Sequence, residues 1–535
     1  MKAESRRSNF FEWVRAPAWM TALLAIVISI ALGPGVAFSQ QRGKLLTLAT
    51  QNNVTTLDPG GLGTLPGWEW LISLAYDPLI WLEADGSFTP ALATSWSFSD
   101  GNKKFALEIR PDVKFSDGTP LDGAAVAASL NYEFKNPAAR AALYAPGWKG
   151  AEATGPTSVV ISCDPACPVM PWLLTQFVEM GSIISPTGLK DPQQLGTKMF
   201  GAGPYVLNEQ ETMSGDRYVF DVNANYWNPS SIHYDRVVLR VIPDNTARLA
   251  ALETGQVDLI DRITLQEASA IPGQLALHGG PENYSGLVIH DIVGQFTEGD
   301  KEGRTYSKPL SNILVRQALN YAVDRETLAK ALGRGFGKPM GVMAVPGTTA
   351  YDPAIDTHYP YDPEKAKALL TEAGYPDGFT LDMTVAAFGP EVEDWAQATA
   401  QYWEAVGIKV NLNAARTTSV WIQQAQLAPS IFVQWGGGTP FGATVYYWFN
   451  KGTTYSQWHV DPELEKMVTE AAAAPVEEQA VLHKAMAKRA VEQGYWVAIA
   501  RYPEFFAYNP AKIKLNMEQN QFAGRPIAPR ITPVQ

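Results

Sequence analysis

Short apolar runs alternate with glycine, proline and polar residues along the chain and predict a mixed α/β protein. Strands are predicted where β-branched and aromatic residues concentrate between turn residues. Helices are predicted where apolar residues recur at a spacing of three and four. The clearest strands are predicted at 44–50, 105–110, 218–222, 237–242 and, at the C-terminal end, 496–508.

Helix ends can be located in the later part of the chain. Asp362 is placed to cap free amides, Pro363 suits the first helical turn, and Gly374 permits a left-handed exit. Asp324 is expected to cap another helix, directly after a segment of helical apolar spacing. Together these signals predict helices at 314–323, 324–333, 363–373, 393–406, 462–473 and 476–494, and a strand at 408–412.

The first residues have the layout of a secretory signal peptide. Basic residues precede an apolar stretch that ends before Gly33 and is shorter than the roughly 20 residues that cross a membrane. Small residues then favour cleavage after residue 39, so 1–39 is expected to be a signal peptide and the mature protein to be periplasmic. The pair Arg6-Arg7 leaves twin-arginine export open beside Sec export.

Charge and length exclude some function classes. The net charge is −12, and loss of the basic leader makes the mature chain more acidic still. An acidic chain without a basic stripe is a poor binder of nucleic acid. The length exceeds what one hydrophobic core supports, so at least two domains are expected.

The two cysteines, Cys163 and Cys167, lie close together in a turn-like segment. In an oxidising compartment they are expected to form a local disulfide. A metal site needs more soft ligands than these two, and the six histidines form no spaced cluster. No metal and no cofactor are therefore expected.

Catalytic motifs are missing from the sequence. It contains no Gly-x-Ser-x-Gly, no His-Glu-x-x-His and no phosphate-binding loop. Acidic residues are frequent, but any chain of this length contains acid pairs. We therefore expect a binding protein and not an enzyme.

A series of short motifs follows in order along nearly the whole chain beyond the leader. The most specific are Tyr76-Asp-Pro-Leu79, Phe105-x-Leu-x-Ile-Arg110, Asp117-Gly-Thr-Pro120, Gly201-Ala-Gly-Pro-Tyr205, Asn225-Tyr-Trp227 and 315–325. In this order they resemble bacterial extracellular solute-binding proteins of family 5, which include the dipeptide- and oligopeptide-binding proteins of ABC importers. Turn chemistry accounts for most of these residues, which are therefore expected to be scaffold.

Two arginines inside the last motif could be taken for anion anchors. Arg316 and Arg325 lie on a predicted helix pair, beside Asp324 and Glu326. Residues three and four apart on helices commonly form ion pairs. Both arginines are therefore expected to make structural ion pairs.

The resemblance implies an α/β, two-lobed periplasmic binding protein fold (type II, cluster C) with an extra subdomain in lobe I. Lobe I is expected at 40–286 with the inserted subdomain at about 68–201, lobe II at 287–490, and a C-terminal return to lobe I at 491–535. Such a protein captures a small-molecule ligand by lobe closure and delivers it to the transmembrane permease subunits of an ABC importer. It is expected to act as a monomer.

Family members contact ligand through three segments, which the resemblance places at particular residues here. The first precedes Leu57, the second is the strand after Phe379, and the third follows a tryptophan. The implied ligand-binding residues are Asn53, Val54, Phe388, Trp421, Trp435, Gly436, Gly437 and Gly438. For both tryptophans, ordinary core packing is the alternative.

Peptide binders of the family pair the ligand's ammonium with an Asp shortly after that tryptophan, and dipeptide binders place an Arg on the preceding strand. This chain has three glycines from Gly436 onward and no cation at 385–388. The expected ligand is thus a peptide or a peptide-like or modified solute, and these gaps favour a free short peptide less than the family resemblance alone does. An oligosaccharide, an opine-like conjugate or a role as a periplasmic sensor remain alternatives.

Overall fold

The computed structural model describes residues 44–54, 56–61, 68–83, 85–135, 145, 147–289, 307–386, 390–416, 418–425, 428, 430–436, 441, 444–445, 448, 461–516 and 525–534. The predicted signal peptide, residues 1–39, lies outside the described residues. Within the described part, no helix is both long enough and apolar enough for a membrane crossing.

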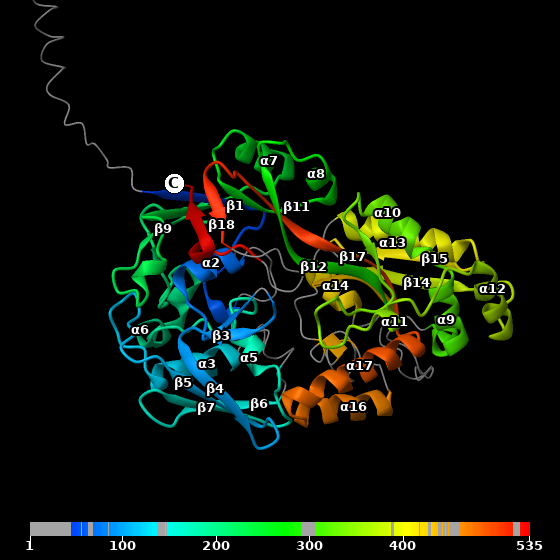
Figure 1. Cartoon of the computed structure of the whole chain (residues 1–535), viewed down its shortest axis with the longest axis horizontal. Coiled ribbons are helices and arrows are strands. Elements are labelled where there is room, and N and C mark those ends of the chain that lie inside the picture. Colours follow the sequence, from blue (N-terminus) through cyan, green and yellow to red (C-terminus); the bar gives the residue numbers. More distant parts are fainter. Residues whose placement is uncertain are drawn as a thin grey trace, which may run out of the picture. The chain divides into compact units, whose positions relative to one another are not determined.

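A large mixed sheet organises the described residues (Figure 1). Its strands are β1 (Leu45–Thr50), β8 (Tyr205–Leu207), β9 (Arg217–Val222), β10 (Arg236–Val241), β11 (Leu259–Ile263), β12 (Ala276–Ile289), β13 (Lys338–Pro339), β14 (Thr380–Val385), β15 (Lys409–Ala414), β16 (Ser430–Gly436) and β17 (Trp496–Tyr508). The main path runs β15-β14-β16-β12-β17-β11-β1-β10-β9-β8, and β13 pairs with β17. The strands predicted from residue patterns are confirmed to within a few residues.

The two longest strands, β12 and β17, join the two halves of this sheet. They run antiparallel to each other over most of their length. One end of β17 pairs with β11 of the first half, whereas the later part of β12 pairs with β16 of the second half. The chain therefore crosses into the second half along β12 and returns along β17.

Three smaller sheets lie apart from the large one. They consist of β4 (Ala93–Ser99), β5 (Lys104–Ile109), β7 (Ser158–Cys163) and β6 (Trp148–Ala153); of β2 (Ile80–Leu82) and β3 (Phe88–Pro90); and of β18 (Ile513–Leu515) and β19 (Ile531–Pro533). Cys163, at the end of β7, forms a disulfide with Cys167, and their Cα atoms are 6.0 Å apart. The limits of the lobes and of the inserted subdomain stay a prediction.

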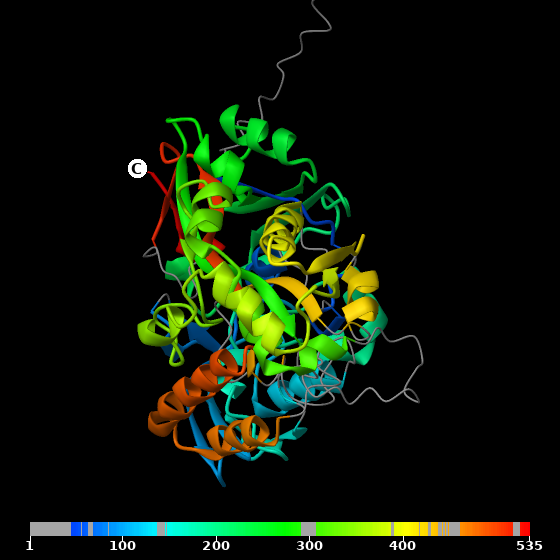
Figure 2. The same ribbon diagram turned by 90° about the vertical axis from the view of Figure 1, so that its right-hand side faces the viewer.

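The helices mostly begin where capping residues predict. They are α2 (Trp68–Ala75), α3 (Gly123–Lys135), α5 (Met170–Leu173), α6 (Pro186–Lys190), α7 (Asn245–Glu253), α8 (Leu265–Ser269), α9 (Ile313–Tyr321), α10 (Arg325–Leu332), α11 (Pro353–Asp356), α12 (Pro363–Glu372), α13 (Pro390–Glu404), α14 (Thr418–Ala425), α16 (Pro462–Ala473) and α17 (Val476–Glu492). Asp362 accepts from the amide of Lys365 at 2.8 Å, and Asp324 accepts from that of Thr327 at 3.0 Å. Helices α16 and α17 lie side by side (Figure 2).

The expected ion pairs of Arg316 and Arg325 are wrong. Both guanidinium groups are buried and donate to backbone carbonyls, Arg316 to Gln493 at 2.8 Å and Arg325 to Ala498 at 2.7 Å. Burial lowers the pKa of Arg325 to about 10. Each guanidinium donates to three backbone carbonyls in all, which uses its several N–H donors without a carboxylate partner. Their role is structural, as predicted, but their partners differ.

The family motifs meet each other in the folded chain. Asp77 of the Tyr-Asp-Pro motif accepts from the indole of Trp227 at 2.7 Å and from the hydroxyl of Tyr226 at 3.0 Å. Burial raises the pKa of Asp77 to about 7, although these hydrogen bonds oppose the shift. The contact joins two motifs that are far apart in the sequence and gives both a structural role.

A buried histidine makes the stability of the second half depend on pH. Burial lowers the pKa of His483 to about 4, and its Nδ1 lies 2.7 Å from the hydroxyl of Thr349. In the unfolded chain His483 takes up a proton near pH 6.5, whereas in the native protein it takes one up only near pH 4. Its contribution to stability is therefore complete above pH 6.5 and is lost as the pH falls to 4.

We predict that His483→Asn reduces the acid sensitivity of folding. Between pH 6.5 and 4, the free energy of unfolding of the wild type should fall by up to about 1.4 kcal/mol per pH unit more than that of the variant. Urea unfolding at several pH values measures this difference. The exposed His358→Asn is the control and should behave like the wild type. Equal pH dependence in all three proteins would contradict the assignment.

Candidate ligand-binding site

The carboxyl end of β1 carries the first predicted ligand segment. Strands β1, β10 and β11 are parallel, so their carboxyl ends share one edge of the sheet. Ligands of α/β sheets bind beyond such an edge. Thr50, the last residue of β1, donates from its hydroxyl to Asp261 at 2.7 Å, which ties the ends of β1 and β11 together.

Asn53 and Val54 follow directly and face different surroundings. Asn53 is exposed, and its side chain lies near Gly215. A Cβ atom added to that glycine would be 3.5 Å from the side-chain oxygen of Asn53. Val54 is buried in the apolar cluster of the first half, and its carbonyl accepts from the hydroxyl of Tyr218 at 3.5 Å. Asn53 therefore has the exposure that a ligand contact needs, whereas Val54 helps to hold the segment in place.

A second edge is formed by the carboxyl ends of β14, β15 and β16. Val385 pairs with Ala414 of β15 and with Phe432 of β16 in parallel registers. The amide of Ala386 donates to Phe432 at 2.9 Å, and that of Ala415 donates to Val385 at 3.3 Å. The ends of β14 and β16, which belong to two of the predicted ligand segments, are thus neighbours in space, and the end of β15 lies beside them.

The predicted tryptophans lie in different places. Trp421 on α14 is 0% exposed and belongs to the larger apolar cluster, which includes residues of both halves, and this burial favours core packing. Trp435 pairs with Tyr284 through the backbone, and the half-buried Gly436 pairs with Asn283 of β12. The second edge therefore ends next to the crossover strand.

Several predicted ligand residues cannot be placed. Phe388, Gly437, Gly438 and the side chain of Trp435 lie outside the described residues. The positions of Asn53 and Gly436 place them at the carboxyl ends of two strand sets, one in each half. Their roles in binding stay predictions.

Sequence reasoning missed Arg416 as a candidate. It lies two residues beyond the end of β15 and is exposed. Its neighbour Ala415 is bonded to Val385, so Arg416 lies at the same sheet edge as the end of β14. The family pattern places the cation on β14 itself, whereas here the parallel pairing of β14 with β15 places the cation Arg416 beside the end of β14.

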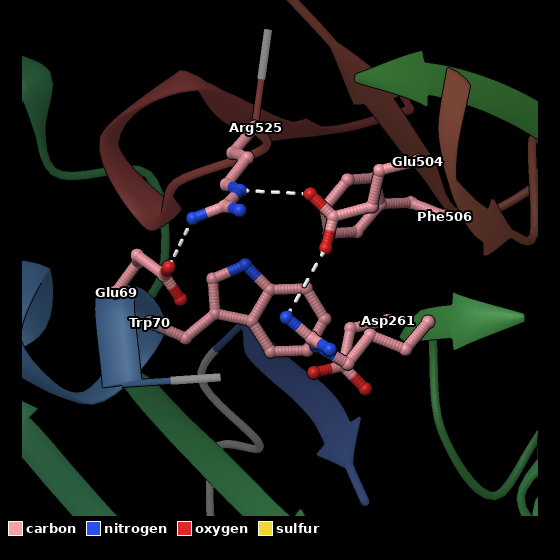
Figure 3. Close-up of a pocket in the computed structure, with 7 residues that line it drawn as sticks. Glu69, Trp70, Asp261, Glu504, Phe506 and Arg525 are labelled. Atoms are coloured by element: carbon pink, nitrogen blue, oxygen red, sulfur yellow. Dashed lines mark hydrogen bonds and ion pairs between the residues drawn. The ribbon is translucent and has the colours of Figure 1, made fainter. Parts of the chain in front are cut away.

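A small hollow with a cavity volume of about 10 Å³, room for about one water molecule, lies beside the crossover strand β17 (Figure 3). It is lined by Glu69, Trp70, Asp261, Arg262, Glu504, Phe506 and Arg525. Arg525 forms ion pairs with Glu69 and, at 2.9 Å, with Glu504, which also faces Arg262 at 3.5 Å. Burial alone would lower the pKa of Arg525, but the charges of Glu504 and Glu69 raise it.

The charged side chains that line this hollow thus form ion pairs with one another. The indole of Trp70 also donates to the carbonyl of Pro526 at 2.6 Å, which fixes the C-terminal segment against α2. We therefore regard the hollow as a structural joint between β11, β17, α2 and the C-terminal segment, and not as the solute site.

No group of three or more His, Cys, Asp or Glu side chains in the described part is arranged to hold a metal ion.

A sequence-family model described as "Bacterial extracellular solute-binding proteins, family 5 Middle" matches residues 87–457. The chain belongs to this family. The resemblance read from the ordered motifs is thereby confirmed.

Relatives and solved structures agree with the family assignment. The glutathione-binding protein GsiB of Escherichia coli (strain K12) is 29% identical over 402 residues, which are 74% of this chain and 73% of GsiB. AgaA of A. tumefaciens R10, in complex with agropinic acid, has a TM-score of 0.73 at 23% identity and covers 89% of this chain and 96% of its own. DppA from Helicobacter pylori, in complex with the peptide STSA, has a TM-score of 0.72 at 20% identity and covers 93% and 99%.

These comparisons confirm the predicted fold and function class. The structural neighbours are two-lobed periplasmic binding proteins of mixed α/β content. This family 5 protein is therefore a solute-binding protein of the kind that serves ABC importers. The relatives are binding proteins of transporters and not enzymes.

Proposed function

We propose that this family 5 protein captures a conjugated or modified peptide-like solute in the periplasm and delivers it to the permease of an ABC importer. Closure of the two lobes would bury the solute, because a ligand favours closure only if it binds the closed state better. The predicted signal peptide supports a periplasmic location. The choice of solute follows from the charges at the two strand edges.

The observation that carries this proposal is the lack of acidic residues at the described strand ends of the second edge. Its described strand ends are formed by 385–386, 414–415 and 433–436, which contain no charged residue. A free dipeptide carries both an ammonium and a carboxylate. Each charge that leaves water needs a charged or strongly hydrogen-bonding partner. None of these described residues is an acid that could pair the ammonium, so a zwitterionic dipeptide is a poor fit to them.

A solute with a masked or displaced amino group fits better. Arg416 offers one exposed cation at this edge, which could pair a single carboxylate. The glycine at 436 leaves backbone groups accessible to a bulkier ligand. The arrangement thus favours an acidic ligand whose amino group is conjugated or lies away from this edge.

The names of two relatives agree with this ligand class, whereas DppA was solved with the peptide STSA. GsiB is a glutathione-binding protein, and AgaA was solved with agropinic acid. Glutathione joins its glutamate through the side chain, so its free amino group does not occupy the position found in an ordinary dipeptide. The spread of ligands among structures of one fold means that the residues at the strand ends, and not the fold, select the solute.

We predict that conjugated solutes stabilise the protein and that simple dipeptides do not. A thermal-shift panel should include free dipeptides, glutathione, opine-like conjugates, oligosaccharides and Ni(II). A ligand at one hundred times its Kd adds about 2.7 kcal/mol of stability, enough for a shift of a few °C. A similar shift with ordinary dipeptides would contradict the proposed ligand class, and a shift with oligosaccharides alone would replace it.

Arg416→Gln should weaken binding of the stabilising acidic compound without unfolding the protein. The loss of one charge-assisted hydrogen bond predicts an affinity roughly tenfold or more lower. Lys409→Gln is the matched control, because this exposed residue lies at the opposite end of the same strand. Isothermal titration calorimetry measures both. An unchanged Kd for Arg416→Gln, or an equal loss for Lys409→Gln, would remove Arg416 from the site.

A further inference from the structure

A side chain in the first half of the chain contacts the end of a helix in the second half. We propose that the turn at Asn102 and the C-terminal end of α16 form a latch between the two lobes, and that this latch forms without a bound solute. Both partners belong to the protein itself, so no ligand is needed to complete the contact. The proposal goes beyond solute capture and does not depend on which solute is bound.

The latch consists of two hydrogen bonds from one amide. The side-chain nitrogen of Asn102 donates to the carbonyl of Ala472 at 2.9 Å and to that of Ala474 at 3.0 Å. Helix α16 ends at Ala473, and the last carbonyls of a helix have no partner within it. Gln479 also donates to the carbonyl of Ala474, at 3.1 Å. Asn102 is only 9% exposed, so water competes little for these bonds.

The contact joins parts of the chain on opposite sides of the crossover strands. Asn102 lies in the turn between β4 and β5, which precedes β12, whereas α16 lies between β12 and β17. Figure 1 shows α16 beside the sheet of β4 to β7, at a distance from the pairing of β12 with β17. When the lobes open about the crossover strands, points far from these strands separate most, so a hydrogen bond there opposes opening effectively.

The disulfide loop holds the turn that carries the latch. The amide of Cys167 donates to the carbonyl of Asn102 at 3.1 Å, and that of Cys163 donates to the carbonyl of Lys103 at 2.7 Å. Asn102 has a φ of 61°, a conformation that asparagine tolerates better than most residues. The backbone of the turn is thus fixed from one side, which leaves the side-chain amide directed at α16.

The hydrogen bonds are strong enough to change the populations of open and closed forms. Two buried hydrogen bonds shift a two-state equilibrium by roughly tenfold or more. Free protein with the latch should therefore be closed more often than free protein without it. A solute that binds the closed form would then bind more tightly, because less of its binding energy is used to close the lobes.

The test is small-angle X-ray scattering of the purified protein without added solute. Asn102→Asp keeps the size and the backbone preference of the side chain but replaces the donor with a carboxylate that faces two carbonyl oxygens. Asn102→Gly removes the side chain and still accepts the positive φ. Both variants should have a larger radius of gyration than the wild type. Lys103→Ala is the control, since this exposed neighbour pairs with Asp164 and not with α16.

Unchanged scattering of both Asn102 variants would overturn the proposal. An equal expansion of Lys103→Ala would also overturn it, because the effect would then be a general loosening of the turn. Circular dichroism and thermal melting establish that each variant is folded. Should Asn102→Asp fail to fold, Asn102→Gly carries the test alone.

The role of the disulfide is tested in the same measurement. Replacement of Cys163 and Cys167 by serine removes the covalent support of the turn but leaves Asn102 in place. The double variant should expand in the same direction as Asn102→Gly and to a smaller extent. A radius equal to that of the wild type would show that the latch does not need the disulfide.

Discussion

The antiparallel pairing of β12 with β17 is the constraint on which the rest of the structure depends. Both strands pass from one half of the large sheet to the other, so each half is held by the same hydrogen-bonded ribbon. The ribbon is tight at Gly286, where a Cβ atom would lie 2.6 Å from the carbonyl oxygen of Val497. It is irregular between Gly279 and Glu282, where the register shifts. Such a ribbon permits bending while it preserves the pairing.

Buried polar contacts secure this ribbon on both sides. Arg501 and Glu282 form an ion pair of 2.9 Å across the two strands, and both side chains are largely buried. Arg525 brings the C-terminal segment to Glu504 of β17 and to Glu69 of α2. These contacts fix the base of the two lobes. Motion between the lobes must then be governed by contacts further away, such as the one that Asn102 makes with α16.

Local features of the fold could be predicted from the sequence, whereas long-range contacts could not. The caps of Asp324 and Asp362 depend on three or four neighbouring residues, and both helices begin where these residues predict. The carbonyl partners of Arg325 include Ala498, and no local pattern indicates that contact. Arg416 was missed because its relation to β14 depends on strand pairing, which residue spacing does not reveal. Trp421 is buried in the apolar core, and its predicted contact with ligand stays a prediction.

The proposed function requires that each protein chain binds one solute at strand ends that lack the charges for a free dipeptide. Native mass spectrometry of protein purified from the periplasm without denaturation tests this claim directly, because the bound compound can be weighed in the complex and identified after release. The account predicts one molecule per chain of a conjugated or modified peptide-like acid. A free dipeptide with both termini unmodified would contradict it.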